Sequence, residues 1–245
     1  MRLRGFGWAL GILAVTAWPC PALAAANVVA RDAGATMERV AEGVYAILHE
    51  DATDSWPHGN TGVVVGSESV LVIDSCYLPS RARGDIALIR SVTPKPVKYL
   101  VFTHWHFDHN NGTVAYRDAF PGLVIVSERE TRGYIDLNSN WWARMSTAAS
   151  STRRADLAKL DERLRAGKDE GGQPLSADAR ARLETAVKQR TSELEELSTL
   201  EVVRPTLVFE REITLSVGGR RVLIQDRGRA NSPHDVTIYL PEDRI

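Results

Sequence analysis

A run of six residues, His104 to His109, constrains this chain more than any other part of its sequence. It reads H-W-H-F-D-H and holds three of the protein's six histidines together with one aspartate. Imidazole nitrogens and carboxylate oxygens are the donors that zinc and similar divalent metals bind. A solvated polar turn is the alternative, but neighbouring histidines gain nothing there unless a metal or a proton relay uses them. The run therefore predicts a metal site.

The residues on either side place this run in a loop at the end of a strand. Residues 97–103 are apolar and rich in strand-forming types, which indicates a buried strand, and residues 113–120 could form a short helix. Open α/β sheets place their sites at the carboxyl ends of strands, so the pattern favours that position for the metal.

Strands and helices alternate along most of the chain, which predicts a layered α/β architecture. We expect early strands at 37–49 (one strand or a hairpin), 61–65, 70–73 and 123–126, with a helix at 79–92 whose apolar residues recur at helical spacing. Late strands are expected at 206–209, 213–217, 221–225 and 236–240, with Gly218-Gly219 as a hairpin turn.

Between about 141 and 200 the pattern changes to Ala, Leu, Arg and Glu, which are strong helix formers. Helices at 153–166 and 176–200, separated by the glycine-rich segment 167–174, predict a helical hairpin inserted over one side of the sheet. A partner-binding coiled coil is the alternative, although the apolar stripe of the second helix is short.

The first 26 residues have the features of a signal peptide: Arg2 and Arg4, an apolar run, and Ala22-Leu23-Ala24 as a cleavage site. They predict a secreted or periplasmic protein, and the apolar run is too short to predict a membrane span. Setting the two arginines aside changes the formal net charge from −1 to about −3. Such a charge indicates neither nucleic acid nor an anionic membrane as a partner.

Cys76 is the only cysteine that follows this leader, so an internal disulfide is excluded in the mature chain. Two interpretations of it remain, a metal ligand or a small buried residue at a strand end.

H-x-H-x-D-H after an apolar strand that ends in Thr resembles the signature of the metallo-β-lactamase superfamily. The stretches N-T-G-V-V-V-G at 60–66, V-L-V-I-D at 70–74 and D-V-T-I-Y-L-P-E at 235–242 are similar to strands of that family. The resemblance extends from about Val40 to Ile245. It implies an α/β fold, an αββα sandwich spanning 27–245, with the helical hairpin as an insert.

The resemblance also implies the chemistry. By this resemblance His104 and His106 would bind one metal ion, and Asp108 and His109 would bind a second. The metal would be zinc, as one or two ions, and iron is less favoured. Metal-bound hydroxide would attack an amide, ester or lactone bond of a small-molecule substrate. Asp108 would be both ligand and catalytic residue, because it would orient the nucleophile. Asp74 would hold the histidine loop by hydrogen bonds, or would only cap its strand.

The chain departs from the family pattern in two places. Asn231 stands where the family has a third histidine of the first site, and an amide oxygen is a poorer zinc ligand than imidazole. His234 is a tentative substitute, or a surface turn histidine. The family also continues past its late strand to further ligands, so we expect the second half of the fold to be incomplete after Ile245.

Three functions are therefore open. The first is an exported zinc-dependent hydrolase. The second is a catalytically impaired or truncated remnant that keeps the fold and acts as a binding module. The third is an iron-containing redox protein, which no additional cofactor motif supports.

Overall fold

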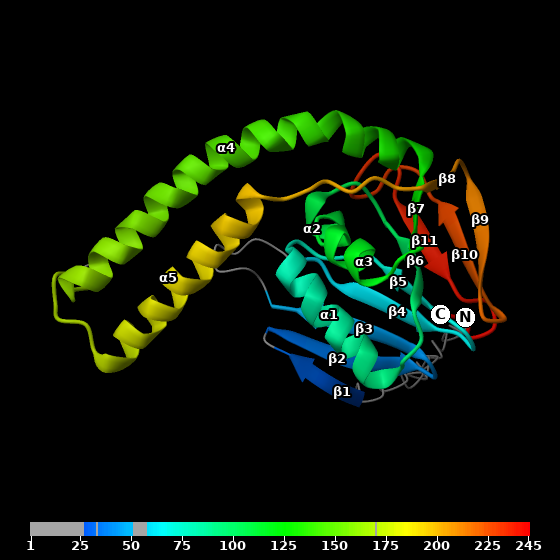
Figure 1. The fold of residues 1–245 in the computed structure, drawn as a ribbon, viewed down its shortest axis with the longest axis horizontal. Coiled ribbons are helices and arrows are strands. Elements are labelled where there is room, and N and C mark those ends of the chain that lie inside the picture. The colour runs from blue at the N-terminus through cyan, green and yellow to red at the C-terminus, as the bar shows by residue number, and fades with distance from the viewer. Residues whose placement is uncertain (1–26, 33, 51–57, 170) are drawn as a thin grey trace, which may run out of the picture.

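The computed structural model describes residues 27–32, 34–50, 58–169 and 171–245, without the side chains of 27 and 139–150. The predicted leader at 1–26 lies outside the described residues. Two sheets form the body of the molecule, and a long helical hairpin projects from it (Figure 1). Within the described residues no helix is long and apolar enough to cross a membrane.

The larger sheet has eight strands in sequence order. They are β1 (Asn27–Asp32), β2 (Ala35–Ala41), β3 (Val44–His49), β4 (Thr61–Val65), β5 (Val70–Ile73), β6 (Val97–Val101), β7 (Val124–Glu128) and β8 (Leu207–Phe209). Neighbours from β1 to β5 are antiparallel, and those from β5 to β8 are parallel. The carboxyl ends of β5, β6 and β7 therefore meet at one edge of the sheet.

The smaller sheet contains three antiparallel strands in the order β11 (Val236–Tyr239), β10 (Arg220–Asp226) and β9 (Glu212–Val217). One hydrophobic core fills the space between the two sheets. On the larger sheet it includes Leu71 and Val101, and on the smaller sheet Leu215 and Ile224. Alternate side chains of a strand point to opposite faces, so Val72 belongs to a second core on the other side.

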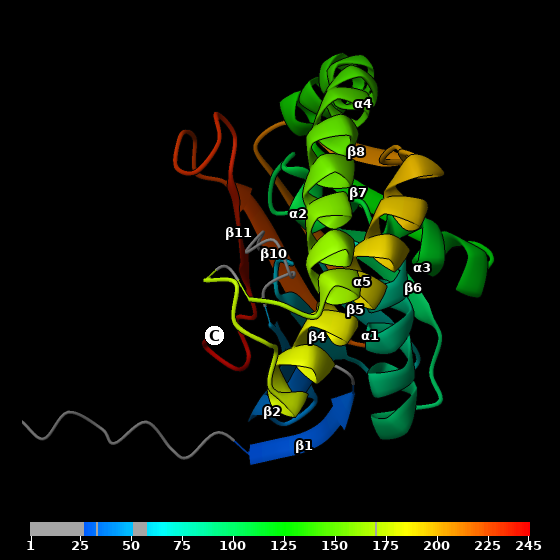
Figure 2. The same ribbon diagram turned by 90° about the vertical axis from the view of Figure 1, so that its left-hand side faces the viewer.

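That second core lies under two helices, α1 (Pro79–Val92) and α3 (Thr113–Ala119), so the layers run helix, sheet, sheet (Figure 2). Pro79 at the first helical turn starts α1, where its missing N–H costs nothing. Thr93, in extended conformation before Pro94, ends it. Ile86 and Ile89 are buried against the sheet, as the helical spacing predicts.

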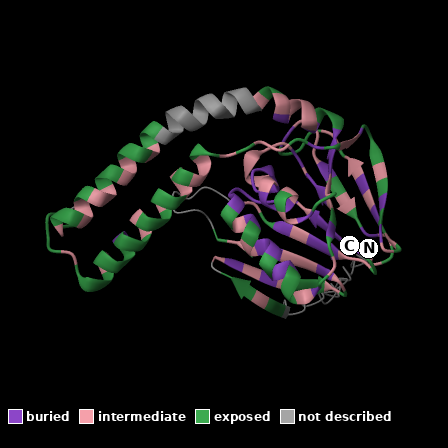
Figure 3. Cartoon of the chain, viewed as in Figure 1, coloured by how far each residue is buried: buried purple, intermediate pink, exposed green. Residues whose placement is uncertain are grey.

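The helical hairpin consists of α4 (Arg129–Ala166) and α5 (Ala177–Ser198), with the left-handed Gly167 ending the first helix. The described side chains of both helices are almost all exposed or half-buried (Figure 3). Two helices follow one another where the sequence predicts a helical hairpin, but α4 begins directly after β7 at Arg129, 24 residues before the expected start at 153. The Glu128 side chain caps it by accepting the backbone N–H of Thr131 over 3.0 Å.

Most other local predictions are also confirmed. The segment 37–49 forms the hairpin β2–β3, which turns at Gly43 with φ +68°. Gly218 and Gly219 both adopt positive φ in the turn between β9 and β10. Strand β1 was not predicted, and it pairs only with β2 at the edge of the larger sheet. Its register, like all pairing across a sheet, depends on the partner strand.

Candidate functional site

The H-W-H-F-D-H run forms the loop after β6 and the short helix α2 (Phe107–Asn110). Asp74 follows β5 beside it, since its backbone N–H donates to the carbonyl of Val101 over 2.8 Å. A loop of the smaller sheet, 227–235, reaches the same edge, where the N–H of Val236 donates to the carbonyl of Thr103 over 3.0 Å. Three segments that are distant in sequence therefore meet at the carboxyl edge of the parallel strands.

The Asp74 carboxylate holds both ends of the run. Its Oδ1 accepts the backbone N–H of Thr103 at 2.8 Å, and its Oδ2 accepts the Thr103 hydroxyl at 2.7 Å. Oδ2 also bonds Nδ1 of His109 at 2.7 Å. Asp74 is 3% exposed and has a φ of 60°, a left-handed conformation that is uncommon outside glycine. Asp74 thus positions the cluster through its hydrogen bonds to Thr103 and His109.

This network determines which nitrogen of His104 faces the cluster. The Thr103 hydroxyl donates its hydrogen to Asp74, so at 2.9 Å it accepts the hydrogen on Nδ1 of His104. The other nitrogen, Nε2, is then an unprotonated acceptor, the form in which imidazole binds a metal. Burial, and next the nearby His109, lower the pKa of His104. The lowered pKa favours the neutral form of the ring.

Two imidazoles are directed at one atom of Asn231. The amide Nδ2 lies 3.0 Å from Nε2 of His104 and 3.2 Å from Nδ1 of His106. The centroids of these two rings are 4.7 Å apart. An amide nitrogen only donates, so both ring nitrogens accept from it. Their lone pairs thus converge on a common point.

Asp108 and His109 form a second pair of donors. Oδ2 of Asp108 lies 3.3 Å from Nε2 of His109. Burial lowers the pKa of His109, but its hydrogen bonds to Asp108 and Asp74 outweigh burial and raise the pKa to about 10. Burial raises the pKa of Asp108, but the His109 hydrogen bond outweighs it and leaves a lowered pKa. Without a metal the pair is therefore a carboxylate and an imidazolium.

The donor chemistry fits a metal centre. The four side chains form two pairs, His104 with His106 and Asp108 with His109, and the ring centroids of His104 and His109 are 4.2 Å apart. Zinc takes neutral imidazole and carboxylate ligands, and at His109 a cation can replace the proton that now lies between the paired groups. The metal-binding roles themselves stay predictions.

His234 lies in a different group. Its Nδ1 is 3.3 Å from Oδ2 of Asp226, and these two residues together with Glu128 can each offer a donor atom within 4.8 Å of the others. The described structure pairs Asn231, and not His234, with the histidines of the run. The backbone explains this, because Asp235 is bonded to Arg227 and Gly228 just after β10, and Val236 is bonded to Thr103.

Two residues that support the site were not predicted. Asp235 accepts the backbone N–H groups of Asn231 at 2.9 Å and Ser232 at 2.8 Å, which holds the loop that carries Asn231. Gly59 has a φ of +65°, and a Cβ there would lie 2.2 Å from the carbonyl oxygen of Asp108. The Asn-Ser-Pro-His-Asp sequence at 231–235 is a turn signal that could have indicated the role of Asp235. A close approach between distant segments, as at Gly59, has no local signal.

Curated relatives of this chain include two alkylsulfatases. The alkyl/aryl-sulfatase BDS1 of Saccharomyces cerevisiae is 20% identical over 84% of the chain, and a linear primary-alkylsulfatase of a Pseudomonas species is 21% identical over 75%. The chain spans only 29% and 31% of the length of these relatives.

Solved structures with a similar fold include a metallo-β-lactamase from Pontibacter korlensis, with a TM-score of 0.54 and 16% identity. The match covers 85% of this chain and 67% of that one. The inverting sec-alkylsulfatase Pisa1 from a Pseudomonas species has a TM-score of 0.50 and 17% identity, and covers 84% of this chain and 29% of its own.

The family model of the metallo-β-lactamase superfamily matches residues 54–245, which contain both sheets' site-forming strands and the histidine run. This match, more than three quarters of the chain, agrees with the mixed α/β fold and with the resemblance first found in the motif. The chain belongs to the metallo-β-lactamase superfamily.

Proposed function

We propose that this protein is a zinc-dependent hydrolase that cleaves an ester, amide or lactone bond of a small molecule. The observation that carries the proposal is the convergence of His104 and His106, whose acceptor nitrogens lie 3.0 and 3.2 Å from a single atom. Since curated relatives are alkylsulfatases, alkyl sulfate esters are the first substrates to test.

In this proposal His104 and His106 hold the first zinc ion, and Asp108 and His109 hold the second. A bound zinc would supply the nucleophile by lowering the pKa of water towards about 7. Asp108 would orient that nucleophile. Asp74 bonds His109 directly and His104 through Thr103, which leaves Nε2 of each of these two rings available. Iron would find the same donors, but it is less favoured.

A second function, a binding module without catalysis, is favoured by one observation. The Asn231 amide occupies the position where a third ligand of the first metal belongs, and it bonds both histidines there. Catalytic zinc usually has three protein ligands and an open position. Two imidazoles and a weak amide ligand would hold zinc loosely, so the fold would bind small molecules and leave them intact.

One experiment separates the two functions. The full chain is purified in the presence of zinc, and its metal content is measured. Hydrolysis is followed with a linear alkyl sulfate, by release of inorganic sulfate, and with p-nitrophenyl sulfate, p-nitrophenyl acetate and a chromogenic cephalosporin. Zinc-dependent turnover that EDTA abolishes and zinc restores supports the hydrolase. His106→Ala should abolish turnover, whereas His234→Ala, on the same loop edge but outside the cluster, should keep it. No turnover, with a zinc content that the double variant His104→Ala/His106→Ala does not lower, would overturn the proposal and support the binding module.

Export by the leader at 1–26 also stays a proposal, supported by its basic start and its A-x-A site. Expression with and without residues 2–26, followed by cell fractionation, tests it. A full-length chain that is processed and leaves the cytoplasm supports export. Equal retention of both forms in the cytoplasm contradicts it.

A further inference from the structure

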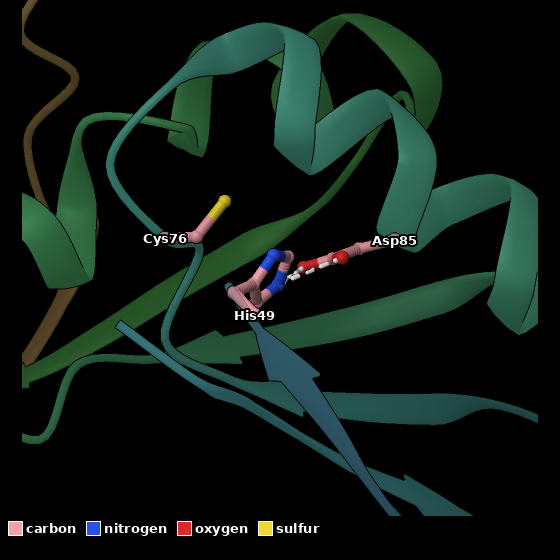
Figure 4. A group of neighbouring side chains, drawn as sticks. All are labelled: His49, Cys76 and Asp85. Carbon is pink, nitrogen blue, oxygen red and sulfur yellow. Dashed lines mark hydrogen bonds and ion pairs between the residues drawn. The ribbon is translucent and has the colours of Figure 1, made fainter. Parts of the chain in front are cut away.

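A second cluster of metal-binding side chains lies on the other side of the larger sheet, under α1. His49 ends β3, Cys76 lies in the loop after β5, and Asp85 belongs to α1. Each offers a donor atom, and the three atoms lie within 4.8 Å of one another. Figure 4 shows Cys76 and Asp85 approaching the His49 ring from different sides.

The cluster is closed to solvent. The His49 side chain is 1% exposed and that of Asp85 is 0% exposed, and Cys76 is also fully buried. Buried polar groups are costly unless each has a partner. Each buried donor atom of the cluster therefore needs a bonding partner.

Hydrogen bonds within the described residues account for only part of it. Nε2 of His49 bonds Oδ2 of Asp85 at 3.2 Å, and the Thr61 hydroxyl donates to the same oxygen over 2.7 Å. Oδ1 of Asp85 also lies 3.0 Å from Nε2, but without the geometry of a hydrogen bond. Nδ1 of His49 and Oδ1 of Asp85 are buried, and neither makes a hydrogen bond within the described part of the chain. In either protonation state of the imidazole, Nδ1 is left with an unused donor or acceptor.

We propose that His49, Cys76 and Asp85 form a buried structural site for one divalent metal ion, with zinc as the best match. Thiolate, imidazole and carboxylate are all zinc ligands, and a thiolate in the set favours zinc over harder ions such as magnesium. A thiolate and a carboxylate carry two negative charges, so one divalent cation makes the buried site neutral. Such neutrality removes most of the cost of burying isolated charges.

The position of the site gives it a structural role. The three ligands come from β3, an interior strand of the larger sheet, from the loop after β5 that also carries Asp74, and from α1, which covers the sheet. A metal would tie these elements together beneath the catalytic edge. His58 borders the cluster, with its ring centroid 6.3 Å from that of His49, and imidazole is a residue type that can complete four-fold coordination.

Sulfur distinguishes this site from the H-W-H-F-D-H cluster, which contains no cysteine. The test uses the full chain produced in cobalt-supplemented medium, so that metal can enter during folding, with Cys20→Ser in every variant to leave Cys76 as the only thiol. Bound Co²⁺ with a thiolate ligand gives a strong near-ultraviolet charge-transfer band. We expect this band at one equivalent, its loss in Cys76→Ser, and its persistence in the double variant His104→Ala/His106→Ala.

A measurement on the protein without site substitutions covers the case in which Cys76→Ser fails to fold. X-ray absorption of the zinc-loaded protein should show a zinc–sulfur distance near 2.3 Å. A folded, metal-loaded protein without any metal–sulfur signal overturns the proposal, as does a charge-transfer band that survives Cys76→Ser. Because both readouts report sulfur, they are independent of whether the protein hydrolyses anything.

Discussion

The side-chain amide nitrogen of Asn231 lies 3.0 Å from Nε2 of His104, in front of the nitrogen that the surrounding bonds leave free for a metal. That nitrogen is an acceptor because Thr103 takes the hydrogen on the opposite side of the ring. Asn231 therefore occupies the position from which a third ligand would complete the proposed first metal site, and its replacement is the most direct test of that proposal.

Asn231→His should raise zinc affinity about tenfold or more, which corresponds to about 1.4 kcal/mol, because imidazole is a much better zinc ligand than an amide. Competition against a fluorescent chelator measures this change. Asn231→Ala is the matched control, since it removes the amide without adding a ligand. If the histidine and alanine variants bind zinc equally well, residue 231 does not face the metal.

Asp74→Asn should lower zinc affinity by about 10- to 100-fold, the usual effect of removing a carboxylate that orients metal-bound histidines. The amide keeps the size of the side chain but presents hydrogens where Oδ2 now accepts from both Thr103 and His109. Asp226→Asn serves as the control, because this carboxylate lies next to His234 outside the run. Unchanged affinity in Asp74→Asn would favour the strand-capping interpretation of Asp74.

The pH dependence of stability in the metal-free protein should report His109. Its pKa rises from 6.5 to about 10 in the folded state, chiefly through Asp108 and Asp74 acting against burial. A raised folded-state pKa gives stabilisation that is complete below pH 6.5 and is lost as the pH rises through about 10. The unfolding temperature of EDTA-treated protein should therefore fall across this range.

His109→Gln should flatten that fall, whereas His234→Gln should leave it unchanged. In a domain of this size, 1 kcal/mol corresponds to about 2–4 °C, so differential scanning fluorimetry at several pH values resolves the effect. Parallel curves for the original chain and His109→Gln would mean that His109 does not carry the stabilising charge.

Gly59→Ala should destabilise the protein and weaken metal binding together. A Cβ at this position would lie 2.2 Å from the backbone oxygen of Asp108, so the segment that carries the H-W-H-F-D-H run would have to move. Gly122→Ala is the matched control, since Gly122 also has a positive φ, +86°, but open space around it. Strain from positive φ alone costs about 1 kcal/mol.

Chemical denaturation should thus show a larger loss for Gly59→Ala than for Gly122→Ala, and only the first should lower zinc affinity. Equal losses of stability with normal zinc binding in both variants would show that the loop tolerates the side chain.

Local patterns in the sequence determined much of the fold. The strands at 61–65 and 70–73 and the helix at 79–92 follow from short apolar runs, helical spacing, and proline at the boundaries. The histidine run was recognisable because its donors are adjacent in sequence. The start of α4 was placed too late because the helix-forming composition begins well after Glu128, the residue whose side chain caps the helix.

Only the tertiary structure decided which donors meet. Asn231 is 127 residues from His104, and Asp74 is 35 residues from His109, so no local pattern encodes either contact. The same holds for His49, Cys76 and Asp85. Each is an isolated position in the sequence, and no local pattern connects the three. The physical reason is that pairing across a sheet and packing of a helix on its face bring together residues whose separation along the chain is arbitrary, whereas propensity and periodicity act only over a few turns or strands.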